Sequence, residues 1–164
     1  MGALTYHRGM GQLRPGDDAP PFSLTDDSGQ SVSSESLGGT RYVLYFYPRD
    51  DTPGCTTEAC QFNENLAAFQ QASVPVIGVS RDDAGSHQAF RTKYGLRFPL
   101  VSDPDRAAHD AYGAWGDRPP RGEGVIRSTF IVGADGRIER AWYGVRSDGH
   151  AGEVLEALGE GAAA

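Results

Sequence analysis

The chain has little cysteine: only two of its 164 residues are Cys. Two thiols are too few for a structural zinc site, and neither Cys-x-x-Cys nor His-x-x-x-His spacing accompanies them. No glycine-rich phosphate loop is present either. The histidines are scattered without ligand spacing, so we expect solvated or capping residues at His7, His87, His109 and His150. The sequence therefore predicts no metal and no bound cofactor.

Long hydrophobic runs and a surplus of basic residues are also missing. Residues 1–14 lack the apolar core of a signal peptide, and no later segment approaches the length of a membrane span. The net charge of −7 argues against nucleic acid and anionic membranes as partners. These absences predict a cytoplasmic protein. In that compartment two nearby cysteines are more often catalytic or metal-binding than a structural disulfide.

The pattern along the chain alternates strands and helices. One domain is expected over residues 13–159, between a flexible leader at 1–12 and a flexible tail at 160–164. The predicted strands are residues 41–47, 74–80, 98–101, 127–132 and 137–143. The predicted helices are residues 53–71, 82–94, 103–112 and 150–158, with an N-terminal hairpin at 22–33 and a loop at 116–124. This order predicts an α/β domain with a central mixed sheet flanked by helices.

Both cysteines lie where the first long strand passes through a turn into a helix. Cys55 falls in the first helical turn, where free backbone N–H groups stabilise a thiolate over a thiol. Cys60, five residues later, is close enough to capture a product formed on Cys55. A redox cysteine at the start of the helix after the first long strand is the arrangement of a thioredoxin-like fold. We therefore expect a redox-active thiol pair.

The helical spacing of the two cysteines has a further consequence. Residues five apart on a continuous helix have Cα atoms roughly 8–9 Å apart. A disulfide needs a Cα separation of less than about 7 Å. Cys55 and Cys60 are therefore expected to form a disulfide only after the first turns of the helix unwind.

The text around Cys55 resembles a known family. Pro48-x-x-x-Thr52-x-x-Cys55 is similar to the peroxiredoxin active-site motif, and FYPRDDTPGCTTEAC resembles the peroxiredoxin Q group, also called bacterioferritin comigratory protein. The likeness continues through residues 76–80, 98–103 and 127–130, and covers roughly residues 13–158. It implies a thioredoxin-like fold with an N-terminal hairpin extension, and a thiol-dependent peroxidase.

The resemblance also implies roles for five residues. Cys55 would be the peroxidatic cysteine and Cys60 the resolving one. Thr52 would hold the peroxide through its hydroxyl, Pro48 would shield the sulfur, and Arg127 would stabilise the charge on Cys55. The implied substrates are hydrogen peroxide and small organic hydroperoxides. The implied reductant is thioredoxin or a similar dithiol protein, acting on a monomer.

Other interpretations remain open from the residues alone. Two helical cysteines could be inert core residues, Thr52 could simply cap the helix, and Arg127 could form a surface salt bridge. Glu58 could orient an arginine or only support the first helical turn. For the whole chain, the rivals are a general thiol–disulfide oxidoreductase and a non-enzymatic redox sensor or holdase.

The sequence departs from the family pattern in two places. Residues 62–64 are Phe-Asn-Glu where relatives often have Phe-Arg-Asp, which changes the polarity of the helix surface. The Pro/Gly-rich segment 119–124, before Arg127, also differs. The second departure concerns reductant docking and loop mobility rather than the chemistry at the thiol.

Overall fold

The structure is a computed structural model that describes residues 11–163. The expected leader lies almost wholly outside the described residues, as does His7. The strands are β1 (Ser23–Asp26), β2 (Ser31–Ser33), β3 (Tyr42–Phe46), β4 (Val76–Ser80), β5 (Leu100–Ser102), β6 (Trp115–Asp117), β7 (Glu123–Val125), β8 (Ser128–Val132) and β9 (Ile138–Tyr143). The helices are α2 (Pro53–Glu64), α3 (Leu66–Gln71), α4 (Ala84–Tyr94), α5 (Ala107–Ala111) and α6 (His150–Ala163).

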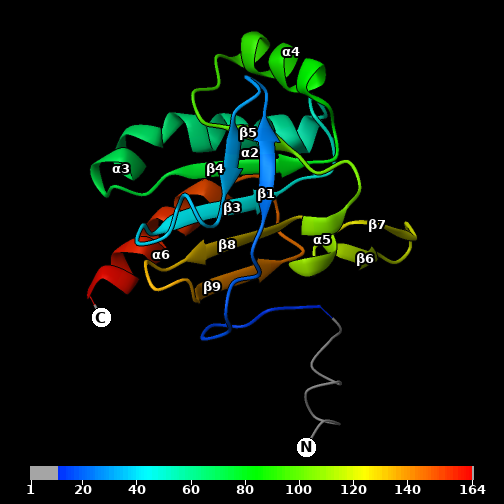
Figure 1. Cartoon of the computed structure of the whole chain (residues 1–164). Helices are drawn as coiled ribbons and strands as arrows, with labels where there is room; N and C mark the ends of the chain where they lie inside the picture. Colours follow the sequence, from blue (N-terminus) through cyan, green and yellow to red (C-terminus); the bar gives the residue numbers. More distant parts are fainter. Residues whose placement is uncertain (1–10, 164) are drawn as a thin grey trace, which may run out of the picture.

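Within the described chain, seven strands form one mixed sheet in the order β2-β1-β5-β4-β3-β8-β9. β3 runs parallel to β4 and antiparallel to β8, and β4 runs parallel to β5. The N-terminal hairpin β1–β2 joins the sheet through β5. Figure 1 shows this hairpin crossing in front of the central strands. The expected mixed sheet and N-terminal hairpin are confirmed.

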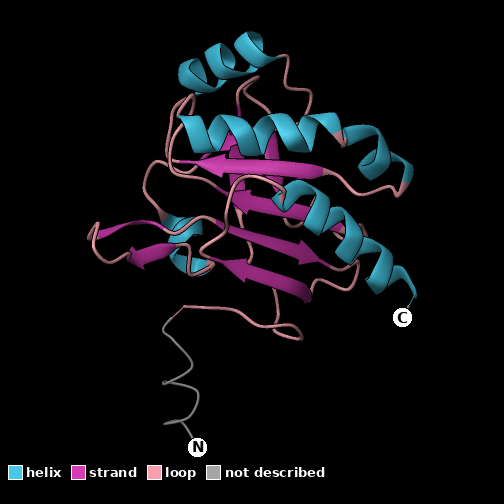
Figure 2. Ribbon diagram, turned by 180° about the vertical axis from the view of Figure 1, so that it is seen from behind, coloured by secondary structure: helices cyan, strands magenta, loops and turns pink. Residues whose placement is uncertain are grey.

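Helices cover both faces of the sheet. Seen from behind, α2, α3 and α6 lie across one face (Figure 2), and α5 lies against the other. Side chains alternate along β3, so Val43, Tyr45 and Tyr47 pack under α2 and α6. Tyr42, Leu44 and Phe46 face the α5 side. All five residues of β3 are buried, as expected for a central strand.

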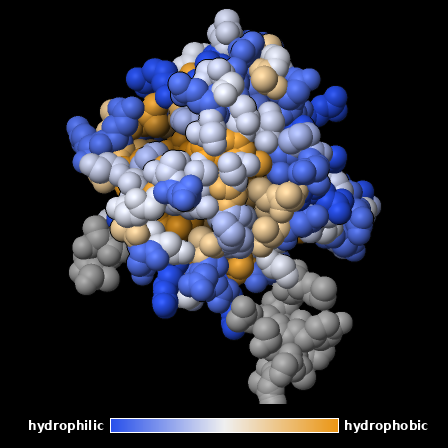
Figure 3. Space-filling model, in the orientation of Figure 1, coloured by the Kyte–Doolittle hydropathy of each residue, from blue (hydrophilic) through white to orange (hydrophobic). Residues whose placement is uncertain are grey.

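The surface in the orientation of Figure 1 is mainly hydrophilic at its rim, with hydrophobic residues gathered near the centre (Figure 3). In residues 11–163 no helix is long and apolar enough to cross a membrane.

The predicted helix over residues 53–71 is in fact two helices. Asn65 separates α2 from α3 with a non-helical φ of −94° and ψ of 5°. Its side-chain Nδ2 donates to the carbonyl of Gln61 at 2.8 Å. Asparagine competes with the helical backbone in this way, which explains the interruption.

The predicted loop at 116–124 was wrong in part, because β6 and β7 pair as a small antiparallel hairpin with Trp115 opposite Val125. The Pro-Pro-Arg-Gly turn at the tip of this hairpin makes the segment rich in Pro and Gly, which is typical of a loop, and the two strands are only three residues long. α5 begins at Ala107 rather than near 103. Asp103 lies before the helix, and its carboxylate accepts hydrogen bonds from the amides of Ala108 and His109 in the first helical turn. α6 continues to Ala163, beyond the expected end at 158.

The expectation of surface or capping histidines was wrong for three of them. His87 and His109 are fully buried, and His150 is 2% exposed. Each has an acidic partner at 2.6–2.8 Å: Asp50, Asp103 and Glu153 respectively. The members of the Asp50–His87 pair are 37 positions apart and meet only in the fold. The other two pairs are six and three positions apart, and what their local sequence does not reveal is the burial of the histidine.

Candidate functional site

The site lies at the carboxyl end of β3, where the chain turns into α2. Residues 48–52, which we call the catalytic loop, connect the two elements. Thr52 is the N-cap residue, with an extended φ of −99°, and Pro53 opens the helix. Proline suits this position because its fixed φ matches a helix and its missing N–H is not needed there. Cys55 follows in the first turn, 1% exposed.

Arg127 reaches Cys55 from the neighbouring strand. β8 begins at Ser128, which pairs with Phe46 at the end of β3 and so brings Arg127 to the same edge. Its Nη2 lies 3.4 Å from the Cys55 Sγ. A guanidinium at this distance stabilises negative charge on the sulfur. Although burial opposes the charge of Arg127, Glu58 and Cys55 raise its pKa, so the group stays a cation.

Glu58 fixes the orientation of Arg127. Its Oε1 accepts from the Arg127 Nη1 at 2.7 Å, and its side chain is fully buried. Burial raises the pKa of Glu58 to about 7, and the nearby guanidinium counteracts part of that rise. Of the two roles considered for Glu58, the structure supports the one in which it orients an arginine.

Gly54 is a member of the site that the sequence reasoning missed. A Cβ at this position would lie 3.2 Å from Arg127 Nη2 and 3.0 Å from Ser147 Oγ. Glycine therefore lets the guanidinium approach the first turn of α2 closely. The signal in the sequence is a glycine directly before the cysteine inside a helix, where glycine costs about 1 kcal/mol relative to alanine.

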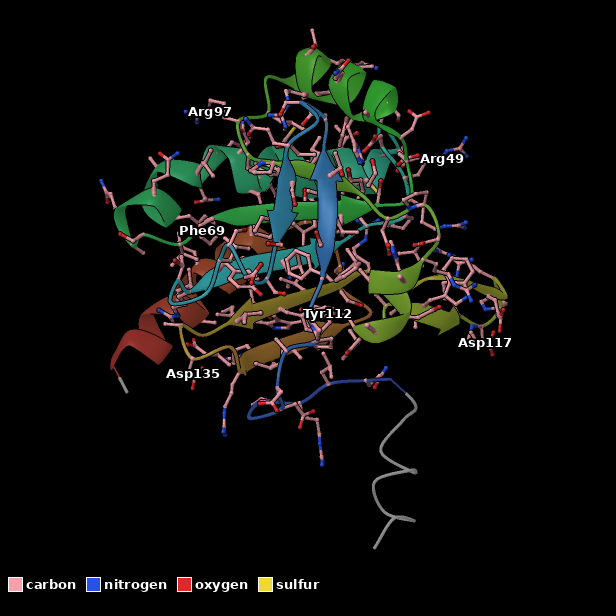
Figure 4. All side chains as sticks on the ribbon, viewed as in Figure 1. Arg49, Phe69, Arg97, Tyr112, Asp117 and Asp135 are labelled. Atoms are coloured by element: carbon pink, nitrogen blue, oxygen red, sulfur yellow. The ribbon has the colours of Figure 1, made fainter. Side chains whose placement is uncertain are left out.

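Thr52 does not act as a side-chain cap. Its Oγ1 donates to the carbonyl of Arg49 at 2.9 Å, and α2 has no side-chain cap hydrogen bond at this residue. Because the hydroxyl proton of Thr52 is used in this bond, its Oγ1 can still accept hydrogen bonds through its lone pairs. Arg49 itself points outward into solvent (Figure 4). Pro48 is half-buried at the start of the loop.

Cys60 lies on the same unbroken helix, and both thiols are free. It is half-buried, and burial together with the nearby Glu64 raises its pKa. Gln61, the next residue, joins α2 to the loop before α6: its Nε2 donates to Asp148 at 2.7 Å, and its Oε1 accepts from the Gly149 amide at 2.8 Å. Cys60 is thus held away from Cys55 while α2 is intact.

In the part of the chain that the structure describes, no three His, Cys, Asp or Glu side chains are grouped to hold a metal ion. At this edge of the sheet, a buried thiol lies next to a cation and the amides of the first helical turn. Such groups can stabilise a sulfur nucleophile and the charge that develops on a departing oxygen.

Comparison with known proteins gives a consistent result. Residues 15–141 match the AhpC/TSA family. The chain is 46% identical over 150 residues to a putative peroxiredoxin of Mycobacterium tuberculosis, covering 90% of this chain and 96% of that one. It is 37% identical over 154 residues to peroxiredoxin Bcp of Escherichia coli, covering 92% and 99%.

Solved structures agree with these relatives. The bacterioferritin comigratory protein of Xanthomonas campestris, described for its alkyl peroxide reduction activity, superposes with a TM-score of 0.82 at 40% identity, covering 86% of this chain and 92% of that one. A PrxQ variant of Xylella fastidiosa gives a TM-score of 0.87 at 37% identity, covering 92% and 98%. The expected thioredoxin-like fold is confirmed.

Proposed function

The chain belongs to the AhpC/TSA family of peroxiredoxins, in the Bcp/PrxQ group of thiol peroxidases, and from this we propose that Cys55 reduces the peroxide and Cys60 resolves the product. The observation that carries the proposal is the buried Cys55 sulfur at 3.4 Å from Arg127, in the first turn of α2. The substrates are hydrogen peroxide and small organic hydroperoxides.

The first step is attack of the Cys55 thiolate on one oxygen of the peroxide. A sulfur–oxygen bond forms as the O–O bond breaks, and the other oxygen leaves, after protonation, as water or an alcohol. Cys55 becomes a sulfenic acid. Arg127 and the helix amides stabilise the charge, while the Thr52 oxygen accepts a hydrogen bond from the peroxide and aligns it. Pro48 shields the sulfur from solvent.

The second step joins the two cysteines. α2 unwinds between its first turn and Cys60, whose sulfur attacks the Cys55 sulfenic acid. A disulfide forms and the hydroxyl of the sulfenic acid leaves as water. A dithiol protein of the thioredoxin type then supplies two electrons through exchange at the exposed disulfide. In this proposal no metal or prosthetic group takes part. Because one chain holds both cysteines, the cycle needs no second subunit and can run in a monomer.

Stopped-flow oxidation of the reduced protein by hydrogen peroxide, followed by tryptophan fluorescence, tests the proposal. A rapid phase that is absent in Cys55→Ser, followed by a slower phase absent in Cys60→Ser, is the expected result. If the thiol titre and fluorescence of the wild type do not respond to peroxide, the peroxidase proposal fails. Disulfide formation without sustained peroxide turnover would instead favour the redox-sensor or holdase role.

A further inference from the structure

The catalytic loop is bound to α4 by a buried carboxylate that the mechanism above does not use. The Asp50 side chain is 3% exposed. It accepts hydrogen bonds from the Tyr47 hydroxyl at 2.5 Å, the Ser86 hydroxyl at 2.8 Å and His87 Nδ1 at 2.7 Å. Three donors converge on one carboxylate, and two of them come from the first turn of α4.

His87 links Asp50 to the central sheet, because its second ring nitrogen contacts β5. Its ring is fully buried, and its Nε2 faces the carbonyl of Val101 in β5 at 3.2 Å. Both ring nitrogens therefore lie within hydrogen-bond distance of oxygen atoms, one of Asp50 and one of the Val101 carbonyl. The pair connects the catalytic loop through α4 to the rigid sheet.

The backbone of the loop is fixed by neighbouring contacts. The Asp50 amide donates to Asp82 Oδ2 at 2.8 Å. Asp51 adopts a left-handed φ of 58°, a conformation that costs a non-glycine residue about 1–3 kcal/mol unless its surroundings hold it. Here its carboxylate accepts from Lys93 at 2.8 Å and Tyr94 at 2.9 Å, both on α4. Two consecutive aspartates thus tie the strained loop to one helix.

We propose that Asp50 and His87 are positioning residues for peroxide reduction: the buried pair holds the catalytic loop so that the Thr52 hydroxyl and the first turn of α2 meet the peroxide correctly. This inference rests on the proposed function of Cys55. A buried polar pair is a poor source of stability, because the cost of removing its groups from water offsets the gain from their contact. Its value lies in the fixed geometry, since a displacement of about 1 Å at a reacting centre can cost up to about 10²-fold in rate.

The chain contains a matched control for this pair. His109 Nδ1 lies 2.6 Å from Asp103 Oδ2, and both side chains are fully buried. This second pair sits between β5 and α5, and its carboxylate bonds to the amides of Ala108 and His109 rather than to the catalytic loop. Loss of either pair removes a buried Asp–His contact, but only one of them involves the residues before Cys55.

The experiment compares His87→Gln, His87→Asn, Ser86→Ala and the control His109→Gln. Glutamine places its amide near the former Nε2 and loses the contact with Asp50, whereas asparagine keeps a donor near the former Nδ1. Ser86→Ala removes one donor to Asp50 at a half-buried position, so this variant is expected to fold. The rate of Cys55 oxidation by hydrogen peroxide and the rate of the later Cys60-dependent phase are measured for each.

We expect His87→Gln to slow Cys55 oxidation about tenfold and Ser86→Ala about threefold. His87→Asn should restore most of the rate, His109→Gln should keep it within about twofold, and the Cys60 phase should not slow in any variant. Unchanged oxidation in Ser86→Ala and in folded His87→Gln, or an equal loss in His109→Gln, overturns the inference. A wild type that does not react at Cys55 instead refutes the proposed function, and the positioning role with it.

Discussion

The two sides of Cys55 are held in contrasting ways. On the N-terminal side, the catalytic loop is tied to α4 through Asp50 and His87, whose side chains are 3% and 0% exposed. On the C-terminal side, the segment 56–62, which we call the Cys60 segment, combines buried contacts at Glu58 and Phe62 with exposed hydrogen bonds at Gln61. Exposed polar contacts open at low cost, whereas buried ones leave unpaired groups when they break. The difference suits a site in which one side aligns the peroxide and the other must move.

The Asn65 break adds a boundary to the movable side. Just before it, Asn63 bonds through its side chain to the Gly95 carbonyl and to the Arg97 amide, at 3.0 and 2.9 Å. Asn63 thereby attaches the end of α2 to the loop after α4. Unwinding that starts near Cys55 is therefore expected to stop before residue 63.

Removal of the Thr52 hydroxyl should have the largest effect on the fixed side. Thr52→Val keeps the β-branched shape but leaves no acceptor for the peroxide, so Cys55 oxidation is expected to slow about 10²-fold. The matched control is Thr57→Val, because the Thr57 hydroxyl bonds only to the Pro53 carbonyl, at 3.1 Å on the exposed surface. Equal rates for both variants in stopped flow would contradict the role of Thr52.

Glu58→Gln should weaken the alignment at Cys55 through Arg127, although Glu58 itself lies in the Cys60 segment. Loss of the carboxylate charge loosens the guanidinium beside Cys55, and oxidation is expected to slow about tenfold. In the wild type, the pKa of about 7 means that Glu58 ionises as the pH passes through 7, which should add a rise to the rate. The pH–rate profile of the variant should lack that rise, and a profile that keeps it would assign it to another group.

The raised pKa of Glu58 also predicts how the stability of the protein depends on pH. Burial raises the pKa of Glu58 from 4.5 to about 7 in the folded protein. Between these two values the folded state binds more protons than the unfolded state, so the contribution of Glu58 to the free energy of unfolding falls as the pH rises. Denaturant titrations at pH 5 and pH 8 should show this loss in the wild type and a smaller one in Glu58→Gln. A loss of equal size in both proteins contradicts the assignment.

Gln61→Ala should act on the movable side alone. Without the contacts to Asp148 and Gly149, the Cys60 segment unwinds more readily, and the Cys60-dependent phase is expected to accelerate about threefold. Cys55 oxidation should not change. Gln70→Ala, at an exposed position of α3, serves as the control. A slower second phase in Gln61→Ala would mean that these contacts assist the resolving step rather than restrain it.

The smallest effect is expected from Glu64→Gln. The pKa of Cys60 is raised by burial and further by Glu64, so removing this charge favours the thiolate that attacks the sulfenic acid. The Cys60-dependent phase should accelerate by no more than about twofold near neutral pH, because burial remains the larger cause. The rate of that phase as a function of pH measures the change, and a downward shift of its midpoint is the expected result.

The sequence was sufficient to predict the elements that are periodic or chemically distinctive. β3 with its apolar residues, the hairpin of β8 and β9, and the helix that starts at Pro53 all follow from local pattern. The mixed sheet followed from their order. Local pattern failed where a side chain interrupts its own backbone, as at Asn65, and where strands are only three residues long, as in β6 and β7.

The site was predictable only where one short motif contains the residues. Thr52 and Cys55 stand in the motif, and Arg127 followed from the resemblance. Asp50 and His87 are 37 positions apart, and no spacing rule joins a loop aspartate to a histidine on a later helix. Gly54 could not be identified from the sequence for another reason. Its lack of a side chain lets Arg127 approach α2, and this contact is known only once the position of Arg127 is known.

Hydrogen–deuterium exchange of the reduced and the disulfide-bonded protein, resolved by peptide, tests the contrast between the two sides most directly. The account predicts that amides of the Cys60 segment lose protection on oxidation, whereas β3 and α3 keep theirs and the catalytic loop stays attached to α4. A disulfide between Cys55 and Cys60 with unchanged protection over residues 56–62 would contradict it, since the bond would then form without unwinding of α2.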